Sequence, residues 1–218
     1  MFQICWKTAR NITPPVIWHF YYAIRRNLDN HNTDKLFNGD DRLFKSILNN
    51  TDIYGEYGCG KSTTWVLNNT KAKVYSVDTD KNWINYIRNR VIDDKRLTTK
   101  WINVGDLGRW GTPLSYSHRD NFHIYTDFLW QREHKPTVVL IDGRFRVCCF
   151  LTTLKYADKG TKILFDDYAE REQYHVVEEF VKPIESCGRQ YLFVVPSSDT
   201  INYSLLNEYI EKFRFVVL

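Results

Sequence analysis

Residues 53–63, Ile-Tyr-Gly-Glu-Tyr-Gly-Cys-Gly-Lys-Ser-Thr, decide the fold because they fit two motifs that imply different proteins. A phosphate-binding loop of the form G-x-x-x-x-G-K-[ST] would run from Gly55 to Ser62. In nucleotide hydrolases and kinases the backbone N–H groups of this loop cradle phosphates, and its lysine, here Lys61, reaches the outer ones. A chance match to so short a pattern has odds of about one in a hundred in a chain of this length.

The same stretch is also an acidic, glycine-rich turn, Glu56-x-Gly58-x-Gly60, which closes a strand and opens a helix. Such a turn holds an adenosine-type cofactor against backbone N–H groups and a helix N-terminus. An acid directly after the first strand would repel phosphates, but it could accept hydrogen bonds from a cationic amino-acid group. The residues downstream have to distinguish the two motifs.

Acidic residues after the later strands favour the cofactor turn. Asp78 follows a predicted strand at 73–77 and lies 18 residues after Gly60. An acid at that offset is placed to hold both hydroxyls of a ribose. A phosphate-loop protein would use Asp142, at the end of 138–142, on magnesium, but Asp78 and Asp166-Asp167 would then have no role. The phosphate loop stays as the alternative.

The rest of the chain alternates apolar, β-rich runs with segments of helical spacing, which is typical of a parallel sheet. We predict an α/β fold with a doubly wound, mostly parallel, Rossmann-like sheet of seven strands. Residues 1–50 are expected to form an N-terminal helical cap, and 51–218 a single domain. After the strand that ends in the glycine turn, the predicted strands are 73–77, 101–104, 137–141, 162–165, 190–195 and 213–218. The predicted helical faces are Trp83-Ile84-Ile87-Val91, Val147-Cys148-Leu151-Leu154 and Val176-Val177-Phe180-Val181, and a further helix is expected over 202–212.

Composition limits the classes of partner. The chain has 218 residues, 30 Lys and Arg against 26 Asp and Glu, and a net charge of +4, so no nucleic-acid partner is expected. Its 5 cysteines form no C-x-x-C pair, which fits the reducing cytoplasm. The start of the chain lacks a signal-peptide pattern. The apolar run 14–24 is too short to span a bilayer, although contact with a membrane surface is an open alternative to packing on the domain.

Two segments together resemble a known family. Ile53–Gly60 and Val74–Trp83 resemble the first two motifs of class I S-adenosylmethionine-dependent methyltransferases, and the resemblance covers roughly residues 50–218. The departure is Lys61-Ser62, where many family members carry small residues. The resemblance implies contacts to the methionine end, the ribose and the adenine of S-adenosyl-L-methionine. The cofactor-binding residues are then Glu56, Gly58, Gly60, Ser62, Asp78 and Asp106, for the last of which a plain Gly-Asp turn is the alternative.

Three further acids follow the fourth and fifth predicted strands. Asp142 ends the run Leu140-Ile-Asp-Gly-Arg144, and Asp166-Asp167 precede Tyr168. Adjacent parallel strands bring these carboxylates to one edge, where they would repel one another unless a cation neutralises them. Oxygen ligands suit Mg²⁺, Ca²⁺ or Mn²⁺. The layout resembles metal-dependent O-methyltransferases of macrolide sugars and catechols, which implies a divalent cation on all three acids. Capping of the helices that follow is the alternative for Asp142 and Asp167.

The acceptor side offers three candidate catalytic residues, Asp142, Arg144 and His175. Arg144 and Arg146 suit bidentate recognition of a carboxylate or phosphate, with an ion pair to Asp142 or Asp167 as the alternative. His175 could act as a general base, although a histidine beside an apolar helical face is more often structural. The loop Arg109-Trp110-Gly111 could wall the acceptor pocket or simply pack.

The sequence thus favours a cytoplasmic, S-adenosylmethionine-dependent O-methyltransferase with a small-molecule or glycan acceptor. Residues 13–20 have a weak likeness to methyltransferases of bacterial surface-glycan clusters, which agrees with a role in glycan biosynthesis. Two alternatives remain: a phosphate-loop kinase or hydrolase that uses Gly55–Ser62, and a non-catalytic scaffold that binds a cofactor or partner.

Overall fold

The computed structural model describes residues 36–37, 40–91 and 94–217. The chain divides into two units, Met1–Leu36 and Phe37–Leu218. Most of the predicted N-terminal cap, including the segment 13–20, lies outside the described residues. The helix α3 (Arg42–Leu48) belongs to the second unit, where the ring of Phe44 packs 6.0 Å from that of Tyr54.

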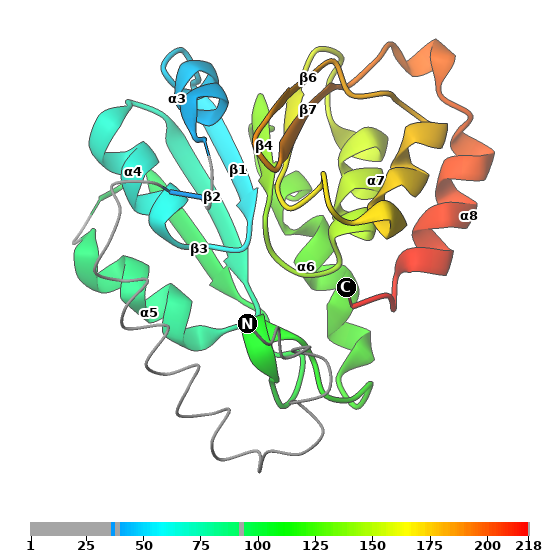
Figure 1. The fold of residues 1–218 in the computed structure, drawn as a ribbon. Helices are drawn as coiled ribbons and strands as arrows, with labels where there is room; N and C mark the ends of the chain where they lie inside the picture. The colour runs from blue at the N-terminus through cyan, green and yellow to red at the C-terminus, as the bar shows by residue number, and fades with distance from the viewer. Residues whose placement is uncertain (1–35, 38–39, 92–93, 218) are drawn as a thin grey trace, which may run out of the picture. The chain divides into compact units, whose positions relative to one another are not determined.

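Among the described residues, seven strands form one sheet (Figure 1). The strands are β1 (Ile53–Tyr57), β2 (Lys73–Asp78), β3 (Leu97–Trp101), β4 (Val138–Ile141), β5 (Lys162–Phe165), β6 (Glu185–Cys187) and β7 (Gln190–Val194). Their order is β3-β2-β1-β4-β5-β7-β6; β1 to β5 run parallel, and β7 runs antiparallel to β5 and β6. The predicted class, a doubly wound and mostly parallel sheet, is confirmed. Chain order reverses direction between β1 and β4, and ligands of such sheets bind at this switch point, outside the carboxyl ends of the strands.

Two predicted strands were wrong. The strand expected at 101–104 lies at 97–101, because the edge strand β3 carries the polar run Leu-Thr-Thr-Lys-Trp and lacks an apolar signature. The strand expected at 213–218 is absent from the described residues, since helix α8 (Tyr203–Phe213) runs through its start and Val217 packs on the core. The seventh strand is instead the short, polar β6, which only its hairpin partner β7 reveals.

Helices cover both faces of the sheet, because right-handed connections that move in opposite directions from the switch point lie on opposite faces. The remaining α-helices are α4 (Lys61–Asn69), α5 (Lys81–Arg90), α6 (Phe122–Asp127) and α7 (Arg146–Tyr156). The 3₁₀-helices are η1 (Arg109–Gly111), η2 (Arg119–Asn121), η3 (Phe128–Trp130), η4 (Glu172–Glu179) and η5 (Ser198–Thr200). The alternation along β1 shows the two layers: Tyr54 packs towards α3, and Tyr57 packs 5.7 Å from Tyr125 of α6.

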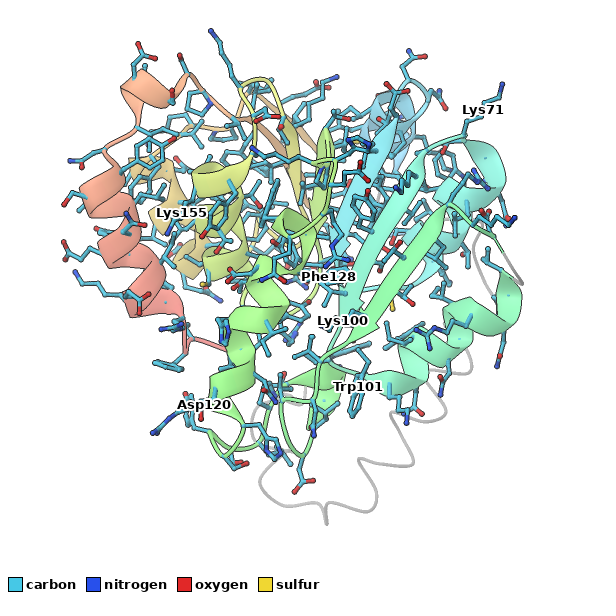
Figure 2. All side chains as sticks on the ribbon, turned by 180° about the vertical axis from the view of Figure 1, so that it is seen from behind. Lys71, Lys100, Trp101, Asp120, Phe128 and Lys155 are labelled. Carbon is cyan, nitrogen blue, oxygen red and sulfur yellow. The ribbon has the colours of Figure 1, made fainter. Side chains whose placement is uncertain are left out.

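The larger core lies between the sheet and the layer of α6, α7 and α8. Every residue of α7 from Arg146 to Leu154 is buried, and Phe150 packs edge-on at 4.9 Å against Phe193 of β7. Figure 2 shows the molecule from behind: Lys155 lies in this helical layer, and Trp101 lies at the end of the edge strand β3. The core thus fixes the carboxyl ends of β4 and β5, where α7 begins and the predicted acids lie.

Candidate functional site at the carboxyl edge of the sheet

The phosphate-loop alternative does not fit the structure. Gly55 lies inside β1 and is paired with both β2 and β4, so the first part of the motif is strand instead of loop. Only residues 58–60 separate β1 from α4, which leaves no wide loop to cradle phosphates. The hydroxyl of Ser62 is buried and donates to Glu56 at 2.8 Å, so it is not directed at a magnesium ion. The turn between β1 and α4 is therefore the short glycine turn of the other interpretation.

Glu56 is fully buried, and its carboxylate accepts hydrogen bonds from four hydroxyl groups. Tyr54 and Ser62 donate to Oε2 at 2.8 Å, Ser76 donates to Oε1 at 2.9 Å, and Thr63 also donates to Oε1. Burial raises the pKa of Glu56 to about 7, although the four donors lower it. Glu56 thus ties α4 to β1 and β2. Its predicted place beside the methionine end of a cofactor stays a prediction, because protein hydroxyls surround the carboxylate here.

Asp78 joins the end of β2 to the glycine turn. Its Oδ2 accepts the backbone N–H of Cys59 at 2.9 Å, and its Oδ1 accepts that of Asp80 at 2.7 Å. The side chain is buried, and this burial raises its pKa to about 6. The two residue groups that the sequence assigned to one cofactor, the turn and the acid of the second strand, are therefore in direct contact.

Close backbone approach explains two glycines at this edge. Gly58 has a φ of +90°, and a Cβ there would lie 2.6 Å from Cα of Gly143, which follows β4. The hydroxyl of Tyr125 lies over Gly143 and leaves no room for a side chain there. Gly60 differs, because a Cβ at that position would meet only the ring of Trp83, at 4.0 Å. The turn is closed towards β4 and open at Gly60, where a ligand can approach the backbone.

The ends of β4 and β5 bring Asp142, Asp166 and Asp167 together, as predicted. One carboxylate oxygen from each lies within 4.8 Å of the others. Nη2 of Arg146 lies 3.2 Å from both Asp142 Oδ1 and Asp167 Oδ2. Arg189, from the turn between β6 and β7, contacts Asp166 at 2.5 Å and Asp167 at 3.1 Å. We call these three acids the acid cluster.

Guanidinium groups already contact most oxygens of the acid cluster. Both oxygens of Asp166 contact a guanidinium group, and so do both oxygens of Asp167, whose Oδ2 also lies 3.0 Å from Arg171. Oδ1 of Asp142 contacts the guanidinium of Arg146. Removal from water, and then the charge of Asp166, raise the pKa of Asp142 well above its usual range. A divalent cation does not fit these acids unless arginines leave them. The predicted cation on the three acids stays a prediction.

Arg144 differs from its neighbour Arg146. Its backbone N–H donates to the hydroxyl of Tyr125 at 3.2 Å, and its Nη1 donates to Thr112 Oγ1 at 3.3 Å, in the loop after β3. Its Nε is buried and has no hydrogen-bond partner among the residues that the structure describes. Burial, and then the charge of Arg146, lower the pKa of Arg144. Of the two arginines for which the sequence left an ion pair open, Arg146 makes it.

The contacts described for the other two predicted residues, His175 and Asp106, do not include the acid cluster. The ring of His175 stacks 4.7 Å from that of Tyr168, and its Nε2 lies 3.3 Å from the Tyr168 carbonyl oxygen. These described contacts do not join it to Asp142, and its predicted role as a base stays a prediction. Asp106 is exposed in the loop after β3, and its contact with adenine is equally untested.

Several residues of the site were missed by sequence reasoning. The period-two alternation of strands would have placed Tyr54 and Glu56 on one face of β1, and so indicated a donor for the buried acid. Arg189 has no such signal, because its place beside Asp166 depends on the antiparallel pairing of β5 with β7. Thr112 lies in an irregular loop, where spacing carries no information about contacts.

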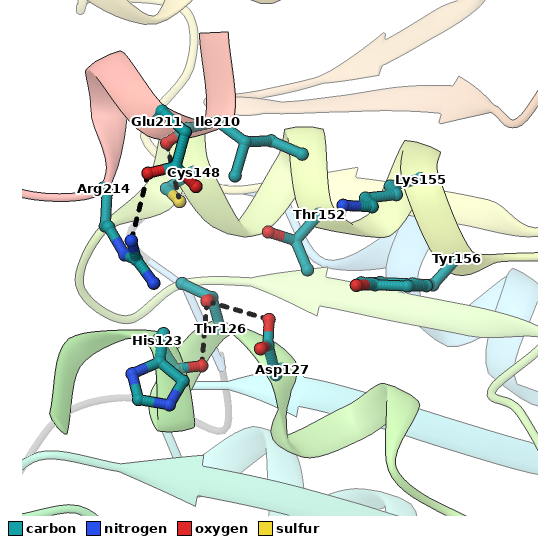
Figure 3. Close-up of a pocket in the computed structure, with 10 residues that line it drawn as sticks. All are labelled: His123, Thr126, Asp127, Cys148, Thr152, Lys155, Tyr156, Ile210, Glu211 and Arg214. Carbon is teal, nitrogen blue, oxygen red and sulfur yellow. Dashed lines mark hydrogen bonds and ion pairs between the residues drawn. The ribbon is translucent and has the colours of Figure 1, made fainter. Parts of the chain in front are cut away.

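A separate cavity of about 200 Å³ lies among α6, α7 and α8 (Figure 3). It is lined by His123, Thr126, Asp127, Cys148, Thr152, Lys155, Tyr156, Ile210, Glu211 and Arg214. None of the glycine-turn or acid-cluster residues lines it. Its walls mix acids with bases, and Glu211 and Arg214 pair with each other at 3.0 Å, so it favours no particular charge in a ligand.

The strand order, the antiparallel β7 and the contact of the glycine turn with Asp78 define a class: the chain has the fold of the class I S-adenosylmethionine-dependent methyltransferase family. The resemblance drawn from the first two motifs is thereby confirmed. No protein-family model matches the sequence, and a search of curated proteins found no match.

Solved structures give the more particular likeness. A methyltransferase-like protein from Silicibacter pomeroyi superposes with a TM-score of 0.69 at 28% identity, over 84% of this chain and 96% of that one. The N-methyltransferase NodS from Bradyrhizobium japonicum, in complex with S-adenosyl-L-homocysteine, gives a TM-score of 0.50 at 12% identity, over 81% of this chain and 98% of that one. At that identity the second likeness concerns the fold alone. In the described part of the chain, every helix is too short or too polar to cross a membrane.

Proposed function

We propose that the protein is an S-adenosylmethionine-dependent methyltransferase that methylates an oxygen of a small molecule or glycan. The observation that carries the proposal is the hydrogen bond from Cys59 N–H to Asp78, which joins the glycine turn to the acid of β2 at the switch point of the sheet. The likeness to the Silicibacter pomeroyi methyltransferase-like protein supports it.

The residues of the turn suit that cofactor. The open side of Gly60 lets a ligand approach the backbone at the start of α4, and the carboxylate of Asp78 keeps lone pairs for ribose hydroxyls beside its two backbone donors. Asp106 is proposed on the adenine side. When bound, the cofactor supplies a methyl group on a positively charged sulfur atom, which is a strong electrophile.

Asp142 is the proposed base for the acceptor. Its Oδ1 is held by Arg146, and 30% of its side chain is exposed. It follows β4 directly before Gly143, which touches Gly58 of the turn. Asp142 would therefore take the proton of an acceptor hydroxyl while the oxygen bonds to the methyl carbon and the carbon–sulfur bond breaks. Little beyond in-line proximity is then needed.

The predicted divalent cation does not enter this proposal, because Arg146, Arg171 and Arg189 contact the acid cluster. Metal assistance would require those arginines to move away. Activity that survives EDTA supports the arginine arrangement, whereas activity restored only by Mg²⁺ or Mn²⁺ would support the cation of the sequence prediction.

The test is methyl transfer from S-adenosylmethionine with a labelled methyl group to panels of sugars, phenols, amines and proteins. The proposal predicts label in a base-stable ether, greatly reduced in Asp142→Asn at unchanged cofactor affinity. Label on nitrogen would overturn the choice of oxygen. Cofactor binding without transfer to any acceptor would favour the non-catalytic scaffold.

A further inference from the structure

In the described part of the chain, Arg144, Arg146, Arg171 and Arg189 lie beside the ends of β4 and β5, and Arg144 differs from the other three in its partners. Arg146, Arg171 and Arg189 each contact a carboxylate of the acid cluster at 3.2 Å or less. Within the part of the chain that the structure describes, Arg144 forms no ion pair with an acid, and its Nε is buried without a partner. A half-buried guanidinium group with an unsatisfied donor is costly, and at this edge of the sheet, where ligands of such folds bind, it suits an anionic group of a ligand.

Arg144 lies where a ligand of the glycine turn would lie. Its backbone follows Gly143, which packs against Gly58, and its guanidinium reaches Thr112 Oγ1 at 3.3 Å. Thr112 follows Gly111, whose carbonyl oxygen accepts the hydroxyl of Thr79 at 2.9 Å, directly after Asp78. The Arg144 side chain therefore extends from the end of β4 towards the end of β2, across the switch point.

A comparison of Arg144 with Arg146 shows that the fold uses the donors of only one of these arginines. Arg146 is 3% exposed and also donates to the backbone carbonyl oxygens of Asp142, Gly143 and Asp166. Its donors are thus used by the protein. Among the described residues, the guanidinium of Arg144 donates to the hydroxyl of Thr112. That hydroxyl can donate to an anion while the guanidinium binds the same anion.

We propose that Arg144 and Thr112 bind a carboxylate or phosphate group of a ligand at this edge. A guanidinium group recognises both by paired, charge-assisted hydrogen bonds. This inference rests on the proposed function, and two ligands could carry the anion: the cofactor, through its amino-acid carboxylate, or an anionic acceptor such as a uronic acid or a phosphorylated sugar.

Calorimetric titration of the wild type and Arg144→Gln with two nucleosides distinguishes the sources. S-adenosylhomocysteine carries the carboxylate, and its decarboxylated analogue keeps the adenosine, thioether and amine. If the cofactor supplies the anion, Arg144→Gln weakens the binding of S-adenosylhomocysteine by about 10- to 100-fold, the usual range for a lost charge-assisted bond. Binding of the decarboxylated analogue is then unchanged. If the acceptor supplies it, both nucleosides bind as before, and the variant loses binding of glucuronate or inorganic phosphate measured with S-adenosylhomocysteine present.

Arg132→Gln is the matched control, because the buried Nε of Arg132 also has no partner among the described residues, whereas Arg132 precedes β4 instead of following it. It should change none of these affinities. The proposal is overturned if Arg144→Gln leaves all four ligands unchanged, or if Arg132→Gln weakens them equally. Failure of the proposed function looks different: the wild type then binds neither nucleoside, and only loss of phosphate or glucuronate binding in Arg144→Gln would support an anion site.

Discussion

Two groups of acids at the same edge of the sheet, one fully buried and one partly buried, are stabilised in different ways. Glu56 is alone, and four neutral hydroxyls donate to it. The acid cluster Asp142, Asp166 and Asp167 contains three carboxylates, and three guanidinium groups contact it. A single buried acid can be tolerated with neutral donors and a raised pKa, whereas converging carboxylates need positive charge.

The difference has a functional side. Ser62 and Thr63 donate to Glu56 and so fix the start of α4, which directly follows the glycine turn. The arginines around the acid cluster join the ends of β4 and β5, and within the described residues Arg144 forms no ion pair with an acid. On the proposed function, the first group supports the cofactor side and the second arranges the acceptor side.

The largest effect should come from removing charge from the acid cluster. Arg146→Met leaves Asp142 and Asp167 short of a buried cation and three backbone carbonyl oxygens short of a donor. We expect a loss of about 3–5 kcal/mol in the free energy of unfolding, measured with urea. The control Arg171→Met removes a partner whose side chain is 39% exposed, so it should cost about 0–1 kcal/mol. Equal losses would contradict the role of Arg146 as the buried counter-ion.

A smaller loss is expected when the hydroxyls lose their acceptor. Glu56→Ala leaves the four buried hydroxyls without that acceptor and should cost about 2–4 kcal/mol in urea unfolding. Glu56→Gln keeps an acceptor oxygen and the volume of the side chain, so it should cost about 1 kcal/mol. If both variants unfolded at the same urea concentration as the wild type, the hydroxyl network would contribute nothing to stability.

The third prediction concerns the pH dependence that Glu56 gives to the stability of the protein. The folded-state pKa of Glu56, about 7, lies above its ordinary value of 4.5, so between these values the folded protein binds more protons than the unfolded chain. Stability should therefore fall as pH rises from about 4.5 to about 7, by about 3 kcal/mol, and stay flat above. The difference between wild-type and Glu56→Gln unfolding curves isolates this contribution. A difference that does not vary with pH would contradict the raised pKa.

The smallest of these effects concerns cofactor affinity. Burial raises the pKa of Asp78 to about 6, and an ionised carboxylate accepts hydrogen bonds from ribose more strongly than a neutral one. Affinity for S-adenosylhomocysteine should therefore fall as pH drops through about 6, by about tenfold between pH 7 and pH 5. Asp78→Asn should bind weakly with little dependence on pH. The same pH dependence in this variant would assign the titration to another group.

The fold was readable from local pattern because apolar periodicity reports buried strands directly. The prediction failed at both edge strands of the sheet, because β3 and β6 are polar. It also failed near residue 217, because Val217 packs on the core without joining the sheet. The carboxyl edge was readable for the same reason, since parallel strands that end in Asp78, Asp142 and Asp166 bring those acids to one side.

The counter-ions were not readable in full. The two arginines after β4 are separated only by Phe145, and the sequence does not distinguish their partners. The structure shows that Arg146 pairs with the acids, whereas Arg144 reaches Thr112. Arg189 comes from a hairpin that the sequence did not predict. Long-range contacts of this kind depend on tertiary packing, and no spacing rule encodes them.

The most direct test of the central claim is calorimetric titration of the wild type and Asp78→Ala with S-adenosylhomocysteine, followed by ATP with Mg²⁺. A cofactor site built from the glycine turn and Asp78 predicts micromolar binding of S-adenosylhomocysteine by the wild type, strong weakening in Asp78→Ala, and no binding of ATP. Binding of ATP alone, abolished by Lys61→Ala, would contradict the methyltransferase interpretation and restore the phosphate loop.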